Sequence, residues 1–255
     1  MSAGLPDAAG KPAGPVGSAG PAGSPGPARP AGSPGPAGPA RPAAPLRTAG
    51  GYSRALAGFA ECGDAFVITH VELGRDGGAL LVAVVDGLGH GQEAGVAARA
   101  ATLTVLAHRA LPVAEILRHC DRELQPTRGA AIGLLRLEAD GRGEFCGIGN
   151  VEVQSLVGVA PGVFCLPGIV GHRPRALRSM PFTMQSGDIY CLHTDGVSGR
   201  GNLRGCLPGV AETVARRIVE GWGRPHDDAT AVVLGYGAGQ QLPPAAPETR
   251  ATAAG

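Results

Sequence analysis

The sequence predicts an antiparallel α+β fold built from layers of strands and helices. Three observations lead to this prediction: two apolar runs separated by a short glycine-rich turn, two successive helix-like segments, and a return to short strands after residue 130. Strands that are joined by tight turns, with the helices grouped in a block, favour antiparallel sheets over the alternating strand and helix pattern of a parallel sheet.

The first 48 residues differ in composition from the rest of the chain. They consist almost entirely of Ala, Gly, Pro, Ser and Arg, and the glycines follow a collagen-like period of three that breaks at Arg29 and Arg41. Such a segment buries too little apolar surface to offset the entropy lost on ordering. We therefore predict a disordered tail over 1–48, a folded domain over 49–236 and a disordered C-terminal tail over 237–255.

The overall composition argues against several classes of function. The formal net charge is +1, which gives no reason to expect a nucleic-acid partner. No secretory signal is visible at the N-terminus, and the apolar runs are far shorter than the roughly 20 residues of a membrane helix. None of the six cysteines forms a C-x-x-C pair, which is typical of reduced thiols. The sequence thus predicts a cytoplasmic protein without a membrane partner.

The first half of the domain is predicted to contain a hairpin and two helices. Residues 65–73 and 79–85 are apolar runs on either side of a Gly-rich turn, so they form an antiparallel pair. Residues 92–110 are rich in alanine with apolar residues at helical spacing. Pro112 is suited to open a second helix over 113–124.

The second half is predicted to consist of short strands and a further helix. Asp140 and Gly141 mark a turn between two of the strands, and glycines interrupt the strand that follows it. Strands are expected over 130–137, 144–153, 163–166, 188–193 and 229–234, and a helix over 208–220. The turn-rich stretch 166–174 is expected to be a surface loop, without an assigned chemical role.

Acidic residues recur in one local context, at strand boundaries beside glycine or another acid. They are Asp64 after Gly63, Asp86 before Gly87, Asp195 before Gly196, and the pair Asp227 and Asp228. Each one alone is typical of a turn or helix cap. Pairing of the strands can bring them to one edge, and an oxygen-only cluster suits Mg²⁺ or Mn²⁺ rather than zinc. Two ions that share a carboxylate can activate water for attack on phosphorus.

These motifs resemble the metal-dependent protein phosphatases of the PPM (type 2C) family, and their order and spacing resemble its bacterial SpoIIE/RsbX branch. The Asp86-x-x-Gly-His-Gly91 motif is characteristic of that branch, and the similarity covers roughly 50–235. Segments 128–131 and 146–150 resemble further parts of the same pattern. Because no sensor or kinase domain is attached, the compact RsbX type is the expected match.

The resemblance implies a fold, two stacked antiparallel β-sheets flanked by α-helices, and a role for each acid. Asp86 would bridge two Mn²⁺ or Mg²⁺ ions and activate water, and the carbonyl of Gly87 would bind one of these ions. Asp64 would serve the same ion, and Asp195 and Asp227 would hold the other. Asp228 would have a supporting role.

Two departures from the better-known eukaryotic members concern the chemistry. Those members carry a histidine two residues after the bridging aspartate, where this chain has Leu88, with His90 two positions further on. General acid catalysis by His90 stays open beside a structural role in the glycine loop. The phosphate-binding arginine upstream of the first acidic motif is replaced by residues 59–62, so the ions themselves are expected to carry most of the phosphate recognition.

The resemblance implies a protein serine/threonine phosphatase, a phosphoric monoester hydrolase. Its partner would be a phosphorylated regulatory protein, either a STAS-type antagonist or a stressosome scaffold, in a pathway that controls a sigma factor during stress. One alternative is a histidine-kinase-like ATP-binding module, which requires an upstream helical asparagine, and none precedes Asn150. The other is a non-catalytic phosphatase-like binding protein, which the presence of all the expected acids disfavours.

Overall fold

The computed structural model of the protein describes residues 47–72, 78–174, 176–237 and 239–244. Residues 1–46 and 245–255, which are most of the two predicted tails, lie outside these ranges, as does most of the predicted 74–78 turn. Both predicted tail boundaries need correction. The first strand begins at Arg47, inside the segment assigned to the N-terminal tail, and a short strand at Gln241–Leu242 lies inside the C-terminal one.

The described chain forms two antiparallel sheets. The first has the strand order β1 (Arg47–Arg54), β10 (Ala229–Tyr236), β8 (Ile189–His193) and β6 (Glu152–Val157). The second has the order β2 (Asp64–Val71), β3 (Ala79–Gly87), β4 (Ala130–Glu138), β5 (Arg142–Ile148) and β7 (Met180–Thr183). A separate pair joins β9 (Gly209–Val210) to β11 (Gln241–Leu242). The predicted hairpin is confirmed, because β2 pairs antiparallel with β3 over the full length of β2.

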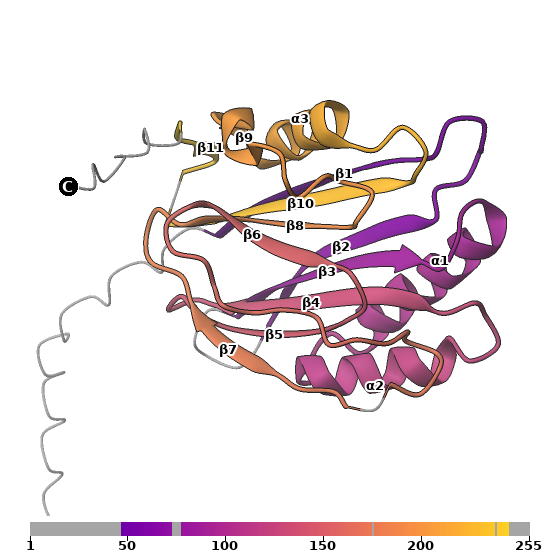
Figure 1. Ribbon diagram of the computed structural model, residues 1–255. Coiled ribbons are helices and arrows are strands. Elements are labelled where there is room, and N and C mark those ends of the chain that lie inside the picture. The colour runs from indigo at the N-terminus through magenta and orange to yellow at the C-terminus, as the bar shows by residue number, and fades with distance from the viewer. Residues whose placement is uncertain (1–46, 73–77, 175, 238, 245–255) are drawn as a thin grey trace, which may run out of the picture. The chain divides into compact units, whose positions relative to one another are not determined.

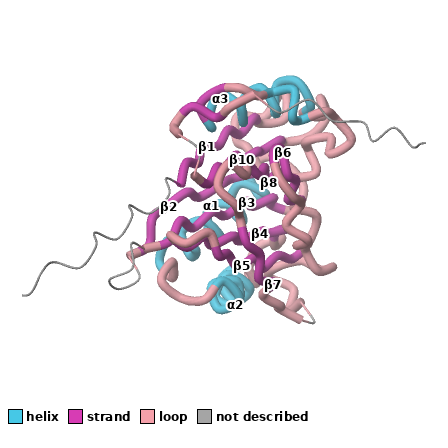
Figure 2. The backbone as a smooth tube through the Cα atoms, turned by 90° about the vertical axis from the view of Figure 1, so that its left-hand side faces the viewer, coloured by secondary structure: helices cyan, strands magenta, loops and turns pink. Residues whose placement is uncertain are grey.

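The two sheets stack face to face and helices cover their outer faces (Figures 1 and 2). Helix α3 (Ala211–Trp222) covers the first sheet, and α1 (Gln92–Ala107) and α2 (Val113–Glu123) cover the second. A single 3₁₀ turn, η1, spans Leu203–Cys206. The predicted α+β fold of two antiparallel sheets flanked by helices is confirmed. Within the described ranges, no helix has both the length and the apolar character needed to cross a membrane.

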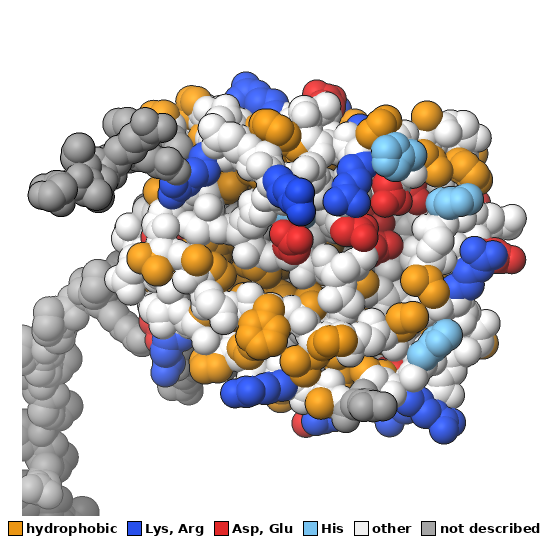
Figure 3. Space-filling view, in the orientation of Figure 1, with side chains coloured by type: hydrophobic (Ala, Val, Ile, Leu, Met, Phe, Trp, Pro, Cys, Tyr) orange, Lys and Arg blue, Asp and Glu red, His pale blue; other side chains and the backbone are white. Residues whose placement is uncertain are grey.

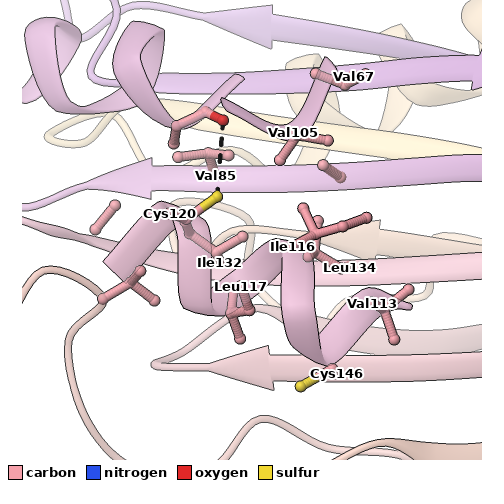
Figure 4. Packing of buried hydrophobic residues seen from close by; sticks show 14 of the residues in the cluster. Val67, Val85, Val105, Val113, Ile116, Leu117, Cys120, Ile132, Leu134 and Cys146 are labelled. Atoms are coloured by element: carbon pink, nitrogen blue, oxygen red, sulfur yellow. Dashed lines mark hydrogen bonds between the residues drawn. The ribbon is translucent and has the colours of Figure 1, made fainter. Parts of the chain in front are cut away.

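Strand β3 is buried on both faces, which explains its continuous apolar run. Its even-numbered residues Leu80, Val82 and Val84 belong to the core between the sheets. Its odd-numbered residues Leu81, Ala83 and Val85 belong to the core under α1 and α2. Figure 4 shows this second core, with the Sγ atom of Cys120 on α2 donating to the Ala101 carbonyl of α1 at 3.9 Å. A strand buried on both faces is stiffly held, so the acid at its end is held as well.

Two of the predicted strand assignments differ from the structure, and strands β1 and β7 were not predicted. The 144–153 strand is two strands, β5 and β6, because Gly149 adopts a positive φ of 103° and turns the chain. The 163–166 segment is not a regular strand and makes a single parallel bridge between Ile148 and Leu166. Strand β1 was missed, because all eight of its residues are half-buried and no apolar alternation marks it.

Gly50 explains how β1 joins the fold. A Cβ atom at this position would lie 2.3 Å from the backbone nitrogen of Glu212 in α3, so the glycine lets the helix rest directly on the strand. We expect Gly50→Ala to lower the free energy of unfolding by about 2 kcal/mol or more, because neither backbone can move aside. Urea unfolding measures this effect. Gly221→Ala is the control, since its Cβ meets no atom within 4 Å and alanine favours the helix by about 0.5–1 kcal/mol. Equal stabilities of the two variants would contradict the close contact.

Candidate metal centre

The predicted acids converge at one edge of the molecule, on the right in Figure 1, where β3 ends and β10 begins. Asp64 opens β2 and lies directly opposite Asp86 in the β2–β3 pair. Asp195 follows β8, and Asp227 precedes β10, which pairs with β8 in the other sheet. Each sheet therefore contributes carboxylates to the same edge, as the sequence predicted. Figure 3 shows red side chains gathered on this part of the surface.

A hydrogen-bond relay joins the two sheets at this edge. The Thr194 hydroxyl, which follows β8, donates to Asp64 Oδ2 at 2.7 Å, and it accepts from the backbone N–H of Thr230 in β10 at 3.1 Å. Thr194 is fully buried, so it holds the Asp64 carboxylate in one orientation. Sequence reasoning gave Thr194 no role. Its position between a buried strand and Asp195 was the available signal.

Asp228 uses both of its carboxylate oxygens within the protein. Oδ1 accepts from the backbone N–H of Leu56 at 2.7 Å, and Oδ2 accepts from that of Gly63 at 3.0 Å. The residue is 3% exposed. Asp228 therefore fixes the loop that leads into Asp64, and its supporting role at the metal centre stays a prediction.

The clustered carboxylates carry more negative charge than the protein itself neutralises. Burial raises the pKa of Asp64 well above its usual range, and the charge of Asp86 raises it further. Burial, followed by the charge of Asp195, raises the pKa of Asp86 to about 7, although a hydrogen bond from Asn150 opposes this shift. The pKa of Asp227 is also raised, first by burial and then by Asp195. Such mutual repulsion is relieved when a cation binds.

The donor set fits a hard divalent cation. It consists of carboxylate oxygens with backbone carbonyls beside them, and no thiol or imidazole belongs to it, which disfavours zinc. In the described part of the chain, no three acidic, histidine or cysteine side chains already stand in ligating positions. Ion binding would thus require rotation of the carboxylates and retained waters, which Mg²⁺ usually keeps.

Gly87 has a packing reason to be glycine. A Cβ atom here would lie 2.2 Å from the Ala94 carbonyl of α1 and 2.8 Å from the Gly63 carbonyl. The Gly87 N–H donates to this Gly63 carbonyl at 3.0 Å. The first turns of α1, the end of β3 and the loop before β2 therefore meet in backbone contact, which brings Asp86 and Asp64 together.

A cleft of about 280 Å³ opens beside Asp86. It is lined by Asp86, Leu88, Ala131, Gly149, Asn150, Pro167, Gly168 and Ile169. Asn150 is a further functional candidate, because it lines the cleft and bonds to the Asp86 side chain. Two larger hollows of about 490 Å³ in the described surface contain none of the clustered aspartates, so we assign the chemistry to the smaller cleft.

No family model matches the chain. The phosphoserine phosphatase RsbX of Bacillus subtilis (strain 168) is 27% identical over 140 residues, which cover 54% of this chain and 68% of that protein. A solved structure of RsbX in complex with magnesium has a TM-score of 0.64 at 22% identity, over 74% of this chain and 95% of that one.

A second solved structure is more similar in sequence. It is described as the bacterial stressosome, a modular system adapted to control secondary messenger signalling, and it is 33% identical with a TM-score of 0.67. The match covers 74% of this chain and 99% of that one. The catalytic domain of the phosphatase PstP in complex with two manganese ions shares the fold, at 18% identity and a TM-score of 0.58 over 74% of this chain and 98% of that one.

The chain belongs to the RsbX/SpoIIE branch of the PPM-type phosphatases. The comparisons support a protein serine/threonine phosphatase. The RsbX structure contains magnesium and the PstP structure contains manganese, two ions that suit an oxygen-only donor set.

His90 lies in the glycine loop of this phosphatase, between Gly89 and Gly91, which both have positive φ. Its ring contacts that of Phe59 with 4.8 Å between centroids, and both residues are exposed. Leu88, at the position where the eukaryotic members carry histidine, is 45% exposed and lines the cleft. The packing partner favours a structural role for His90, and acid catalysis by it stays a prediction.

A positioned general acid contributes roughly 10²–10⁴-fold to the rate. Because the packing of His90 favours a structural role, we expect His90→Ala to reduce kcat by less than about fivefold. The reaction should be followed with a phosphoserine peptide and with an aryl phosphate. The first has a poor leaving group that needs protonation, whereas the second leaves without it. A loss of 100-fold or more that is confined to the peptide would instead assign the acid role to His90.

Proposed function

We propose that this phosphatase hydrolyses phosphoseryl and phosphothreonyl groups on a regulatory protein, with two Mn²⁺ or Mg²⁺ ions held by Asp64, Asp86, Asp195 and Asp227. One observation carries the proposal. Acids from both sheets meet at one edge, raise each other's pKa and border a cleft through Asp86. The Gly87 carbonyl is the proposed backbone ligand.

Bound ions would supply a water of lowered pKa and would neutralise charge on the phosphoryl oxygens. The residues of the chain prepare the site for this chemistry. Asp86 is the proposed bridge, and Asn150 orients its carboxylate from the cleft wall. Thr194 fixes Asp64, and Asp228 fixes the loop before it. This support matters because catalysis requires that ligands are held in place before the substrate arrives.

The proposed substrate is a phosphorylated STAS-type antagonist or stressosome scaffold in a cytoplasmic pathway that regulates a sigma factor. Support comes from the stressosome structure at 33% identity and from RsbX, a phosphoserine phosphatase. A structure of RsbU and RsbW domains from Mycobacterium tuberculosis shares the fold at 17% identity.

The test is incubation of the full chain with phosphorylated STAS-domain proteins encoded in the same genome, with and without Mn²⁺. We expect Mn²⁺-dependent release of phosphate from one of them. Turnover of an aryl phosphate that depends on Mn²⁺, without release from any STAS protein, would retain the phosphatase and reject this substrate class. Absence of both reactions would reject the activity and favour the non-catalytic binding protein.

A further inference from the structure

Phe164 is the most exposed aromatic residue in the described part of the chain, with 57% of its surface accessible. Its neighbours Val163 and Cys165 point the other way and pack against the core between the sheets. Successive side chains of an extended chain point to opposite sides, which explains why Phe164 is exposed. The Phe164 side chain is therefore not part of that core. A large apolar side chain held in water favours contact with a partner.

The segment that carries this ring, 163–173, is fixed along its length. Leu166 donates to the Gly147 carbonyl and accepts from the Gly149 N–H, both at 2.9 Å. Further along, Val170 exchanges two backbone hydrogen bonds with Ala130, at 2.9 and 3.0 Å. The Asp121 carboxylate of α2 accepts from the N–H groups of Gly171 and Arg173, at 2.7 and 3.2 Å. A surface that is ordered beforehand loses little entropy when a partner binds.

The 163–173 segment also forms one wall of the cleft beside Asp86. Pro167, Gly168 and Ile169 line this cleft, and the half-exposed Leu88 lines it as well. The segment that carries Phe164 therefore reaches the proposed site of chemistry through Pro167, Gly168 and Ile169. Figure 3 shows hydrophobic side chains gathered below the acidic group on the same face of the molecule.

Positive charge lies at the end of the segment. Arg173 is exposed and has a positive φ of 55°. Among the described residues, no other residue except glycine has a positive φ. The two hydrogen bonds to Asp121 hold the chain in this strained turn, and strain of this kind gathers at functional surfaces. The adjoining turn at Gly129 packs against Ile169 and His172, which places Arg128, an exposed residue paired with Glu93, beside the same surface.

We propose that the 163–173 segment is the docking surface for the phosphorylated segment of the protein substrate. Phe164 and Ile169 contact an apolar side chain near the phosphoserine, and Arg173 contacts an acidic one. The inference rests on the proposed function and deepens it, because it states which residues flank the phosphoserine. A phosphorylated segment suits this surface for two reasons. The surface leads into the cleft beside Asp86, and the positive charge of Arg173 complements an acidic side chain.

The test compares two phosphoserine peptides with the full chain and Mn²⁺. One peptide has leucine and glutamate around the phosphoserine, and the other has glycine and lysine. We expect kcat/KM to be about tenfold or more higher for the first, since a buried aromatic anchor is typically worth that much. Phe164→Ala should remove most of this preference and leave aryl phosphate turnover unchanged. Arg173→Asn, in which asparagine tolerates the positive φ, should remove part of the same preference.

Leu103→Ala is the matched control, because Leu103 is 68% exposed on α1 and does not line the cleft. It should change neither reaction. If Phe164→Ala keeps the wild-type peptide preference, or lowers aryl phosphate turnover equally, the docking surface is rejected and the phosphatase stands. If the wild-type chain hydrolyses neither the peptides nor the aryl phosphate, the proposed function fails before any variant is needed.

Discussion

Asp86→Asn is expected to abolish Mn²⁺-dependent hydrolysis of an aryl phosphate, with a loss in kcat of about 10³-fold or more. Asparagine keeps the shape of the side chain and removes the charge that the proposed bridge between two ions requires. Steady-state kinetics over a range of Mn²⁺ concentrations measures the loss. Asp140→Asn is the control, since Asp140 is an exposed turn residue that binds Arg142 between β4 and β5. Unchanged turnover in Asp86→Asn would reject the metal mechanism.

The same substitution is expected to stabilise the protein in the absence of metal. The pKa of Asp86 is raised from 3.8 to about 7 in the folded protein, so the folded state disfavours the charged carboxylate. The wild-type protein therefore loses stability as the pH rises from about 4 to about 7, and this loss is complete above that range. Asp86→Asn lacks this contribution. We expect its metal-free melting temperature to exceed that of the wild type at pH 8, and the two to approach each other at pH 5.

Mn²⁺ is expected to raise the melting temperature of the wild-type protein by about 5–10 °C for each ion bound. An ion present at 100 times its dissociation constant stabilises the folded state by about 2.7 kcal/mol per site, and a domain of this size gains about 2–4 °C per kcal/mol. The physical reason is the excess negative charge among Asp64, Asp86 and Asp227, which the ions neutralise. Differential scanning fluorimetry, with the chelator EDTA as reference, measures the shift.

Asp86→Asn again gives the matched control for this measurement. It should shift much less with Mn²⁺, because one negative charge is gone and the proposed bridging carboxylate has become an amide. An equal shift in wild type and variant would place the ions elsewhere. Addition of EDTA to the wild type should remove both the stabilisation and the turnover, and renewed Mn²⁺ should restore them.

The fold was predictable where its signals are local. The continuous apolar run of β3 and the alanine-rich sequence of α1 can each be recognised from a few consecutive residues. The acids were predictable for the same reason, since each lies beside glycine or another acid at the boundary of a recognisable strand. Their convergence followed from antiparallel pairing, which returns strand ends to one edge.

The parts that sequence reasoning missed depend on distant contacts. Nothing near Arg47–Arg54 shows that this segment pairs with β10. Its Gly50 serves the approach of a helix that lies more than 150 residues away in the sequence. The bond from Thr194 to Asp64 spans 130 positions. Phe164 resembled part of a buried strand, although only its two neighbours face the core.

The hydrogen bond from Thr194 to Asp64 also bears on how activity arises during folding. The carboxylates belong to two sheets, so neither sheet alone contains the complete site. A nascent chain that ends before Asp227 and β10 lacks this acid and one of the two partner strands of β8. Closure of such a long loop is a slow event in folding. Recovery of catalysis after dilution from denaturant should therefore follow the docking of the two sheets, later than the gain of helix content.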